Sequence, residues 1–99
     1  MELKELDPVL HSQLRLAIVS VLVSVGEADF NLLREKTHST SGNISVQLAK
    51  LRTAGYIEIS KTFKDNYPLT RCKLTAKGLS AFGNYREAIQ DYLFPEKEG

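Results

Sequence analysis

The chain has 99 residues, which suits one domain with a modest hydrophobic core. Charged residues make up 25% of it and hydrophobic residues 42%, as in ordinary globular proteins. The acidic N-terminus and the lack of an apolar run of about 18 residues argue against a signal peptide and a membrane helix, so we expect a cytoplasmic protein. A single cysteine, Cys72, excludes an internal disulfide and a Cys-x-x-Cys metal site.

The net charge of +1 conceals an uneven distribution along the chain. Residues 30–73 carry eight basic and three acidic side chains, whereas residues 1–29 carry two basic and five acidic ones, and residues 74–99 three and four. A local excess of positive charge attracts phosphate whatever the total charge is. An unevenly charged, solvated surface is the alternative interpretation.

Two helices are expected in the first part of the chain, at about residues 9–25 and 29–36. Pro8 suits the first turn of a helix, and Gly26 suits the end of one. The first helix is apolar over most of its circumference, which predicts burial on two sides. Asp29 is the expected N-cap of the second helix.

A third helix is expected at about residues 41–54, where a cluster of polar residues precedes an amphipathic stretch. Ile44, Leu48 and Leu51 are spaced i, i+4, i+7 and predict its core face. Gly55 then ends the helix.

Residues 57–74 predict a β-hairpin. Ile57 and Ile59 alternate with polar residues, which is typical of a half-buried strand, and residues 64–68 form a turn-prone stretch. Thr75 then caps a long final helix at about residues 76–93. The order of helix, helix, helix, hairpin and helix predicts a mainly α fold with a small β-hairpin (α+β), a winged helix-turn-helix spanning residues 1–99 as one domain.

The stretch from Ser41 to Leu51, followed by Ala54-Gly55-Tyr56-Ile57, resembles the MarR/ArsR-type winged-helix regulators. Further similarity lies in Lys61-Thr62-Phe63, in Leu74-Thr75-Ala76-Lys77-Gly78, and in Ala81-Phe82 with Tyr85. The resemblance extends over about residues 6–93 and implies a small single-domain winged helix that binds DNA. It also implies transcriptional regulation, usually repression, by a homodimer built from the first and last helices.

The third helix is the expected DNA reader, because an α-helix fits the major groove of B-DNA. Asparagine and glutamine can bond bidentately to adenine, a valine can touch a thymine methyl group, and lysine or a helix start suits phosphate. A solvated amphipathic helix is the less favoured interpretation. The expected DNA contacts on this helix are Ser41, Gly42, Asn43, Ser45, Val46, Gln47 and Lys50.

Three basic residues on or near the hairpin could contact the DNA backbone. Lys64 and Arg71 are favoured for this role, whereas for Lys61 it is no more favoured than an ordinary exposed strand charge. The expected duplex is a near-palindrome, because a two-fold dimer presents two recognition helices about 34 Å apart.

The final helix extends beyond the winged-helix unit and carries apolar residues at helical spacing. With the apolar first helix it predicts a homodimer, although it could instead fold back over its own core. The expected interface residues are Leu14, Ile18, Leu79, Phe82, Tyr85, Ile89, Tyr92 and Leu93.

The sequence contains no pattern typical of an enzyme, a metal site or a cofactor site. His11 and His38 are isolated, which predicts capping or surface roles for both. Cys72 is expected to be a small buried residue, with a redox-sensing role as the alternative. A protein-interaction module is the alternative to a DNA-binding regulator, and a small-molecule effector, which the sequence does not identify, would bind at the dimer interface.

Overall fold

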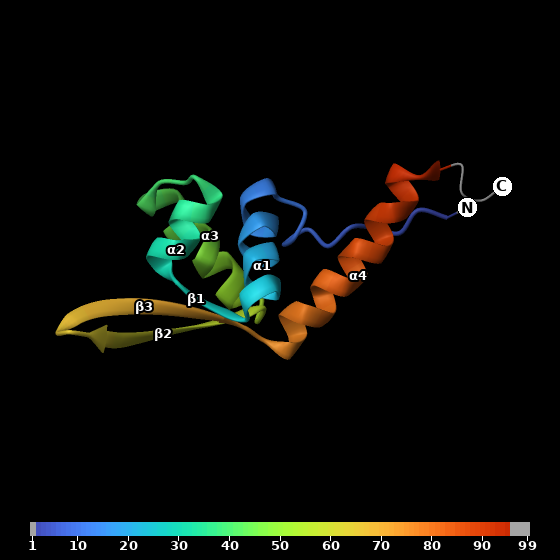
Figure 1. Ribbon diagram of the computed structural model, residues 1–99. Coiled ribbons are helices and arrows are strands. Elements are labelled where there is room, and N and C mark those ends of the chain that lie inside the picture. The colour runs from blue at the N-terminus through green and yellow to red at the C-terminus, as the bar shows by residue number, and fades with distance from the viewer. Residues whose placement is uncertain (1, 96–99) are drawn as a thin grey trace.

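The computed structural model describes residues 2–95 and has four helices and a three-stranded sheet (Figure 1). This architecture is α+β and confirms the winged-helix prediction. In chain order the elements are α1 (Gln13–Val25), β1 (Glu27–Asp29), α2 (Phe30–Thr37), α3 (Ser41–Thr53), β2 (Ile57–Lys64), β3 (Tyr67–Leu74) and α4 (Ala76–Leu93).

Helix α1 begins at Gln13, about four residues later than the sequence pattern predicts. Asp7 is the reason, because its Oδ1 accepts hydrogen bonds from the backbone amides of Val9 and Leu10 at 2.8 and 3.4 Å. This Asx-type turn includes Pro8 and postpones the helix. The other end is as expected, since Gly26 has φ of 84° and closes α1.

The sheet contains a strand that the sequence did not indicate. The three residues of β1 pair antiparallel with β3, which lies between β1 and β2 in the sheet. A strand of three residues is too short to show an alternating pattern. Asp29 ends it and, as predicted, caps α2 by accepting a hydrogen bond from the amide of Leu32 at 2.8 Å.

A tight turn joins α2 to α3. His38 adopts the left-handed conformation, with φ of 53°, and ends α2. Thr40 is the N-cap of α3, where its hydroxyl accepts from the amide of Asn43 at 3.1 Å. The predicted core face of α3 is confirmed, because Ile44, Leu48 and Leu51 are all buried.

The wing is the hairpin of β2 and β3. Its strands pair from Ile57 opposite Leu74 to Lys64 opposite Tyr67, and Asp65 and Asn66 form the turn with φ of 53° and 67°. Two residues with positive φ are typical of the tight turns that match the twist of a hairpin.

Helix α4 is joined to the body of the molecule at its first turn. The Thr75 hydroxyl accepts from the amide of Gly78 and donates to the carbonyl of Gly55. Gly78 has a steric role, since a Cβ at this position would overlap the carbonyl oxygen of Tyr56 and crowd Leu74. The Leu-Thr-x-x-Gly motif therefore packs the first turn of α4 against the residues that follow α3.

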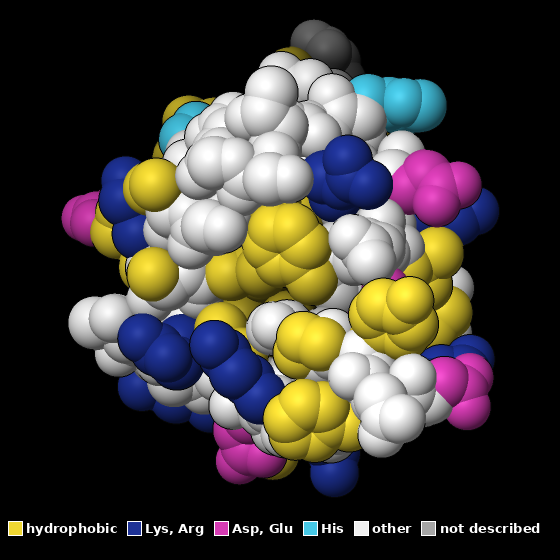
Figure 2. Space-filling view, turned by 90° about the vertical axis from the view of Figure 1, so that its left-hand side faces the viewer, with side chains coloured by type: hydrophobic (Ala, Val, Ile, Leu, Met, Phe, Trp, Pro, Cys, Tyr) yellow, Lys and Arg dark blue, Asp and Glu magenta, His cyan; other side chains and the backbone are white. Residues whose placement is uncertain are grey.

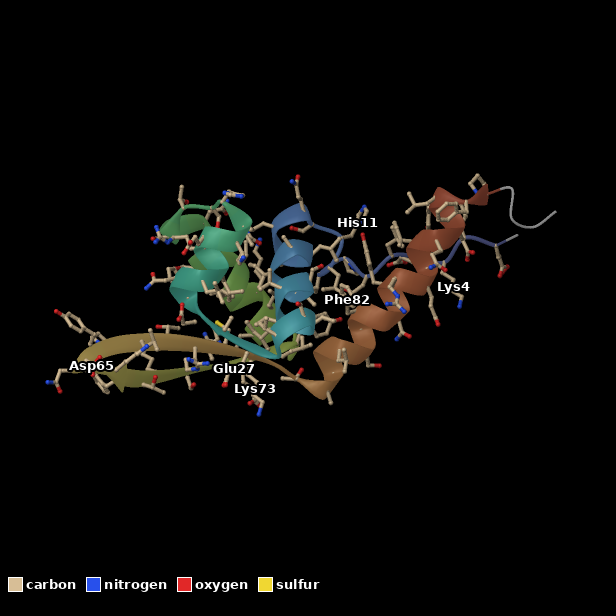
Figure 3. The ribbon with its side chains drawn as sticks, viewed as in Figure 1. Lys4, His11, Glu27, Asp65, Lys73 and Phe82 are labelled. Carbon is tan, nitrogen blue, oxygen red and sulfur yellow. The ribbon has the colours of Figure 1, made fainter. Side chains whose placement is uncertain are left out.

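From this first turn α4 extends away from the wing, and the molecule measures 59 × 25 × 21 Å. Figure 1 shows the N-terminal segment running along α4. The Tyr92 hydroxyl donates to the carbonyl of Lys4 at 2.6 Å, and the Tyr56 hydroxyl donates to Asp7. Figure 3 places Lys4 beside α4 and Asp65 at the opposite end of the molecule.

Two of the predicted interface residues lie inside the monomer. Ile18 is fully buried in the core, and Tyr85 is 8% exposed with its hydroxyl 3.0 Å from Nδ1 of His11. The prediction that these side chains face a second copy is therefore wrong, because the body of the chain and its N-terminal segment already cover them. Of the others, Leu14, Phe82 and Ile89 are half-buried, whereas Leu79, Tyr92 and Leu93 are exposed.

Candidate nucleic-acid interface

Helix α3 presents a face of small and polar side chains to solvent. Opposite its buried stripe, six of the seven residues predicted to contact DNA are exposed, and Gln47 is half-buried. Val46 is the only large apolar member, with 52% of its surface exposed. The exposed residues on this face are Ser41, Gly42, Asn43, Ser45, Val46 and Lys50.

Gly42 lies in the first turn of α3 and has no structural need to be glycine. Its φ is not positive, and a Cβ added to it would meet nothing within 4 Å. An alanine would favour the helix more strongly at an ordinary position. A bare backbone here leaves room for close approach by another molecule.

Asn43 and Gln47, which are one helical turn apart, are linked to each other and to α1. Nη1 of Arg15 donates to Oε1 of Gln47 at 2.6 Å, and Nε2 of Gln47 donates to Oδ1 of Asn43 at 3.4 Å. No sequence pattern indicates that Arg15 belongs to this surface, because it lies 32 residues before its partner on another helix.

The wing has two faces, which the strand register distinguishes, because residues directly opposite each other share a face. Lys61 and Thr70 share the face of the core residues Ile59 and Cys72, so they lie on the side of the helices. Lys61 also lines a groove of about 320 Å³ together with Arg52 of α3. The geometry therefore brings Lys61 beside α3.

Arg71 lies on the opposite face of the sheet. Its register partners are Ser60 on β2 and Asp29 on β1, and its Nε is 3.7 Å from Oε1 of Glu27. This placement disagrees with the expectation that Arg71 is a better candidate than Lys61 for a DNA contact. Lys64, opposite Tyr67, shares the face of Arg71 by the same register, but it lies beside the turn at the tip of the wing.

Two aromatic side chains at the wing tip were not recognised from the sequence. Phe63 and Tyr67 are each 76% exposed, the highest exposure among the large hydrophobic residues that the structure describes. Figure 2 looks at the molecule from this end and shows hydrophobic side chains in the middle of the face, with acidic ones at its edge. The sequence could have indicated their exposure, because both residues lie close to the predicted turn, at the end of the hairpin that is farthest from the core.

Cys72 lies in the core, where β3 pairs with Ala28 of β1 and Ile59 of β2. It is fully buried, and burial, together with the negative charge of Asp29, raises the pKa of its thiol to about 11. The predicted burial of Cys72 is confirmed. A thiol in this environment is mostly protonated at neutral pH and poorly reactive.

Within residues 2–95, no group of three or more His, Cys, Asp and Glu side chains is placed to hold a metal ion. No helix in the same range is long and apolar enough to cross a membrane.

The chain is similar to known proteins over most of its length. The family described as winged helix DNA-binding domain matches residues 14–93. An uncharacterized protein of Methanocaldococcus jannaschii is 35% identical over 77 residues, which are 78% of this chain and 84% of that protein.

Among solved structures, the transcriptional regulator homologue of Pyrococcus horikoshii OT3 is similar, with a TM-score of 0.80 and 21% identity, over 86% of this chain and 84% of that one. A mutant MarR from E. coli in complex with operator DNA has a TM-score of 0.70 and 16% identity. That match covers 87% of this chain but 59% of MarR. Both similarities concern the fold.

The family is one of DNA binders and not of enzymes. The order of elements, the exposed polar face of α3 and the adjoining wing agree with the family match over residues 14–93. The chain therefore belongs to the family of winged helix DNA-binding domains.

Proposed function

We propose that this protein is a homodimeric transcriptional regulator that binds double-stranded DNA sequence-specifically and represses by occupying a near-palindromic operator. The observation that carries the proposal is the face of α3, which is small, polar and exposed beside a groove lined by Lys61 and Arg52. Such a helix fits the major groove, with the wing against the neighbouring backbone.

Within this proposal, the DNA contacts divide by chemistry. Asn43 and Gln47 meet base edges, and Val46 meets a thymine methyl group. Ser41 and Lys50 bind phosphate, while Gly42 and Ser45 let the helix approach closely. On the wing, Lys61 binds phosphate from the side of the helices and Lys64 binds it from the tip, while Arg71 holds Glu27 on the far side of the sheet.

The homodimer is supported by what α4 leaves exposed. Its 18 residues extend about 27 Å, and Tyr85 and Tyr92 are the side chains of α4 that bond to His11 and Lys4 of the N-terminal segment. Leu79 and Leu93, exposed by 53% and 63%, lie on another side of the helix, with Phe82 and Ile89 between them at helical spacing. Val23 and Val25 at the end of α1 continue this surface, since they line a groove together with Leu79.

An apolar surface at the end opposite the wing suits a two-fold dimer, in which each copy covers the other's α4. We therefore revise the predicted interface by removing Ile18 and Tyr85, which are buried in the monomer. The revised set consists of Leu14, Val23, Val25, Leu79, Phe82, Ile89, Tyr92, Leu93 and the exposed Phe94.

An unbiased selection of duplexes from a random pool tests the proposal. We expect enrichment of a near-palindrome with half-sites about 10 base pairs apart. Lys50, Lys61 and Lys64 of both subunits give about six phosphate contacts, so a plot of log Kd against log salt should have a slope of about 5. A pool without enrichment, or an affinity independent of salt, would exclude DNA binding.

A protein-interaction module is the second candidate, because Val46 on α3 and both Phe63 and Tyr67 at the wing tip are exposed apolar side chains. Exposed aromatic residues are enriched at protein interfaces. The duplex selection separates the two functions, since a module that recognises a protein leaves the pool unenriched.

A further inference from the structure

Three polar side chains form a directed chain of hydrogen bonds from α1 to the exposed face of α3. Arg15 donates to Gln47 at 2.6 Å, and Gln47 donates to Asn43 at 3.4 Å. Arg15 and Gln47 are half-buried and Asn43 is exposed, so the chain leads from the protein interior outward.

The direction of this chain follows from the chemistry of its first member. A guanidinium group has only N–H donors, so the atom of Gln47 that faces Arg15 has to be its carbonyl oxygen. The NH₂ group of Gln47 is then the part that faces Asn43, and it has to meet the oxygen of Asn43 for the same reason. The NH₂ group of Asn43 is left pointing away from Gln47.

Arg15 is itself held in place by the N-terminal segment. Its Nε donates to the carbonyl of Val9 at 2.6 Å, and its Nη2 lies 3.4 Å from the carbonyl of Pro8. Asp7 anchors this segment through its turn and through the Tyr56 hydroxyl. The guanidinium therefore has a fixed position before any ligand arrives, and so have the two amides that depend on it.

We propose that Arg15 is a positioning residue that sets the base preference of α3, by orienting Gln47 so that the NH₂ group of Asn43 turns toward the major groove. This inference rests on the proposed function and deepens it. An outward NH₂ group suits the two acceptors of guanine, N7 and O6. Bidentate pairing with adenine needs the amide oxygen as well, to accept from N6, and the oxygen of Asn43 is turned toward Gln47 and away from the groove.

The test is the duplex selection carried out with wild type and a set of variants. Asn43→Ala identifies the base pair that Asn43 faces, because enrichment is lost there. Wild type is expected to prefer guanine over adenine at that position by at least about fivefold. An adenine preference in wild type would overturn the inference.

Gln47→Glu reverses the chain while retaining the hydrogen bond with Arg15. A carboxylate only accepts, so the Asn43 amide has to turn its NH₂ group toward position 47 and its oxygen toward the DNA. The preference should then move from guanine to a base with an exocyclic amine, cytosine or adenine. Total affinity will fall because of the added charge, but the ratio between bases is the measurement.

Arg15→Leu removes the source of the direction, and Arg15→Lys preserves a donor at the same place. We expect the leucine variant to bind guanine and adenine within about twofold of each other and the lysine variant to keep the guanine preference. In the free proteins, the side-chain amide NMR signals of Gln47 and Asn43 should shift in Arg15→Leu and remain in Arg34→Leu, an exposed control on α2.

The outcomes distinguish this inference from the proposed function. An unchanged guanine preference in both Gln47→Glu and Arg15→Leu overturns the positioning role and leaves DNA binding intact. A wild-type pool without enrichment overturns both. If Arg15→Leu does not fold, Gln47→Glu still tests the positioning role of Arg15, because this substitution removes no packing against the core.

Discussion

At the scale of single residues, two glycines differ in whether the fold requires them. Gly78 is required by packing, since any side chain would enter the Tyr56 carbonyl, whereas Gly42 faces open space. A glycine that the fold does not need, on the surface proposed to meet DNA, is best explained by close approach of the ligand.

Gly42→Ala is therefore expected to separate stability from binding. The variant should be more stable by about 0.5 kcal/mol, because alanine favours a helix more than glycine does. Its affinity for the selected duplex should fall at least severalfold, because the added methyl group lies between the helix and the DNA. Urea unfolding and a binding titration measure the two effects, and Gly78→Ala is the control, which should lose stability. Unchanged affinity in Gly42→Ala would contradict the proposed approach of α3.

The raised pKa values of two side chains, Tyr56 and Cys72, predict how the free energy of unfolding depends on pH. Burial, the hydrogen bond to Asp7 and the charge of Asp7 raise the pKa of Tyr56 from 10.0 to about 12. The pKa of Cys72 is raised from 9.0 to about 11. Both groups hold their protons more tightly in the folded chain than in the unfolded one. Their contribution to stability is therefore complete below about pH 9 and is lost as the pH rises toward 12.

Urea unfolding at a series of pH values should accordingly show a free energy of unfolding that declines between about pH 9 and 12. In Tyr56→Phe the decline should be smaller above about pH 10, and in Cys72→Ala it should be smaller between about pH 9 and 11. Equal declines in wild type and both variants would show that other groups are responsible.

At the scale of elements, the wing shows what the alternation of residues along a strand predicts and what only the pairing of strands determines. Alternation along β2 correctly separated Ile57 and Ile59 from their polar neighbours. Along β3, the burial of Cys72 turns its neighbour Arg71 to the opposite face, and the register between the strands decides which β2 residues share each face. The register places Lys61 beside α3 and Arg71 beside Glu27.

Lys61→Ala should therefore weaken binding to all duplexes alike. It should also reduce the slope of log Kd against log salt by about 2, because each of the two subunits then neutralises one phosphate fewer. Arg71→Ala, the matched control on the other face, should leave the slope unchanged. Titrations at several salt concentrations measure both. The opposite result, with Arg71 altering the salt dependence and Lys61 not, would place the DNA on the other side of the wing.

At the scale of the whole molecule, α4 and the N-terminal segment form an arm at the end opposite the wing. The inner side of α4 is used within the monomer, by hydrogen bonds such as those of Tyr85 and Tyr92. The exposed apolar residues on its other side have no role in the monomer. Under the proposed function, a second copy of the chain covers these residues.

Leu79→Glu combined with Leu93→Glu is expected to give a folded monomer, because both side chains are exposed and neither supports the core. Wild type should sediment as a dimer at micromolar concentration, and the double variant as a monomer that no longer binds the palindrome tightly. Ser80→Glu, an exposed position elsewhere on α4, is the control and should remain dimeric. A wild type that sediments as a monomer would refute the dimer.

The sequence by itself determined the four helices and the two strands of the wing, though not β1, and it marked α3 as the helix expected to read DNA. Ile44, Leu48 and Leu51 define the buried face of α3, and Asp29 and Thr75 mark helix starts as predicted, because periodicity and capping act over a few residues.

Only the tertiary structure decided which side chains meet across elements. It buried Ile18 and Tyr85, placed the N-terminal segment along α4, and joined Arg15 to Gln47. These outcomes depend on contacts between segments tens of residues apart. No local pattern encodes such contacts, because they arise only when the packed helices and the paired strands fix one another's positions.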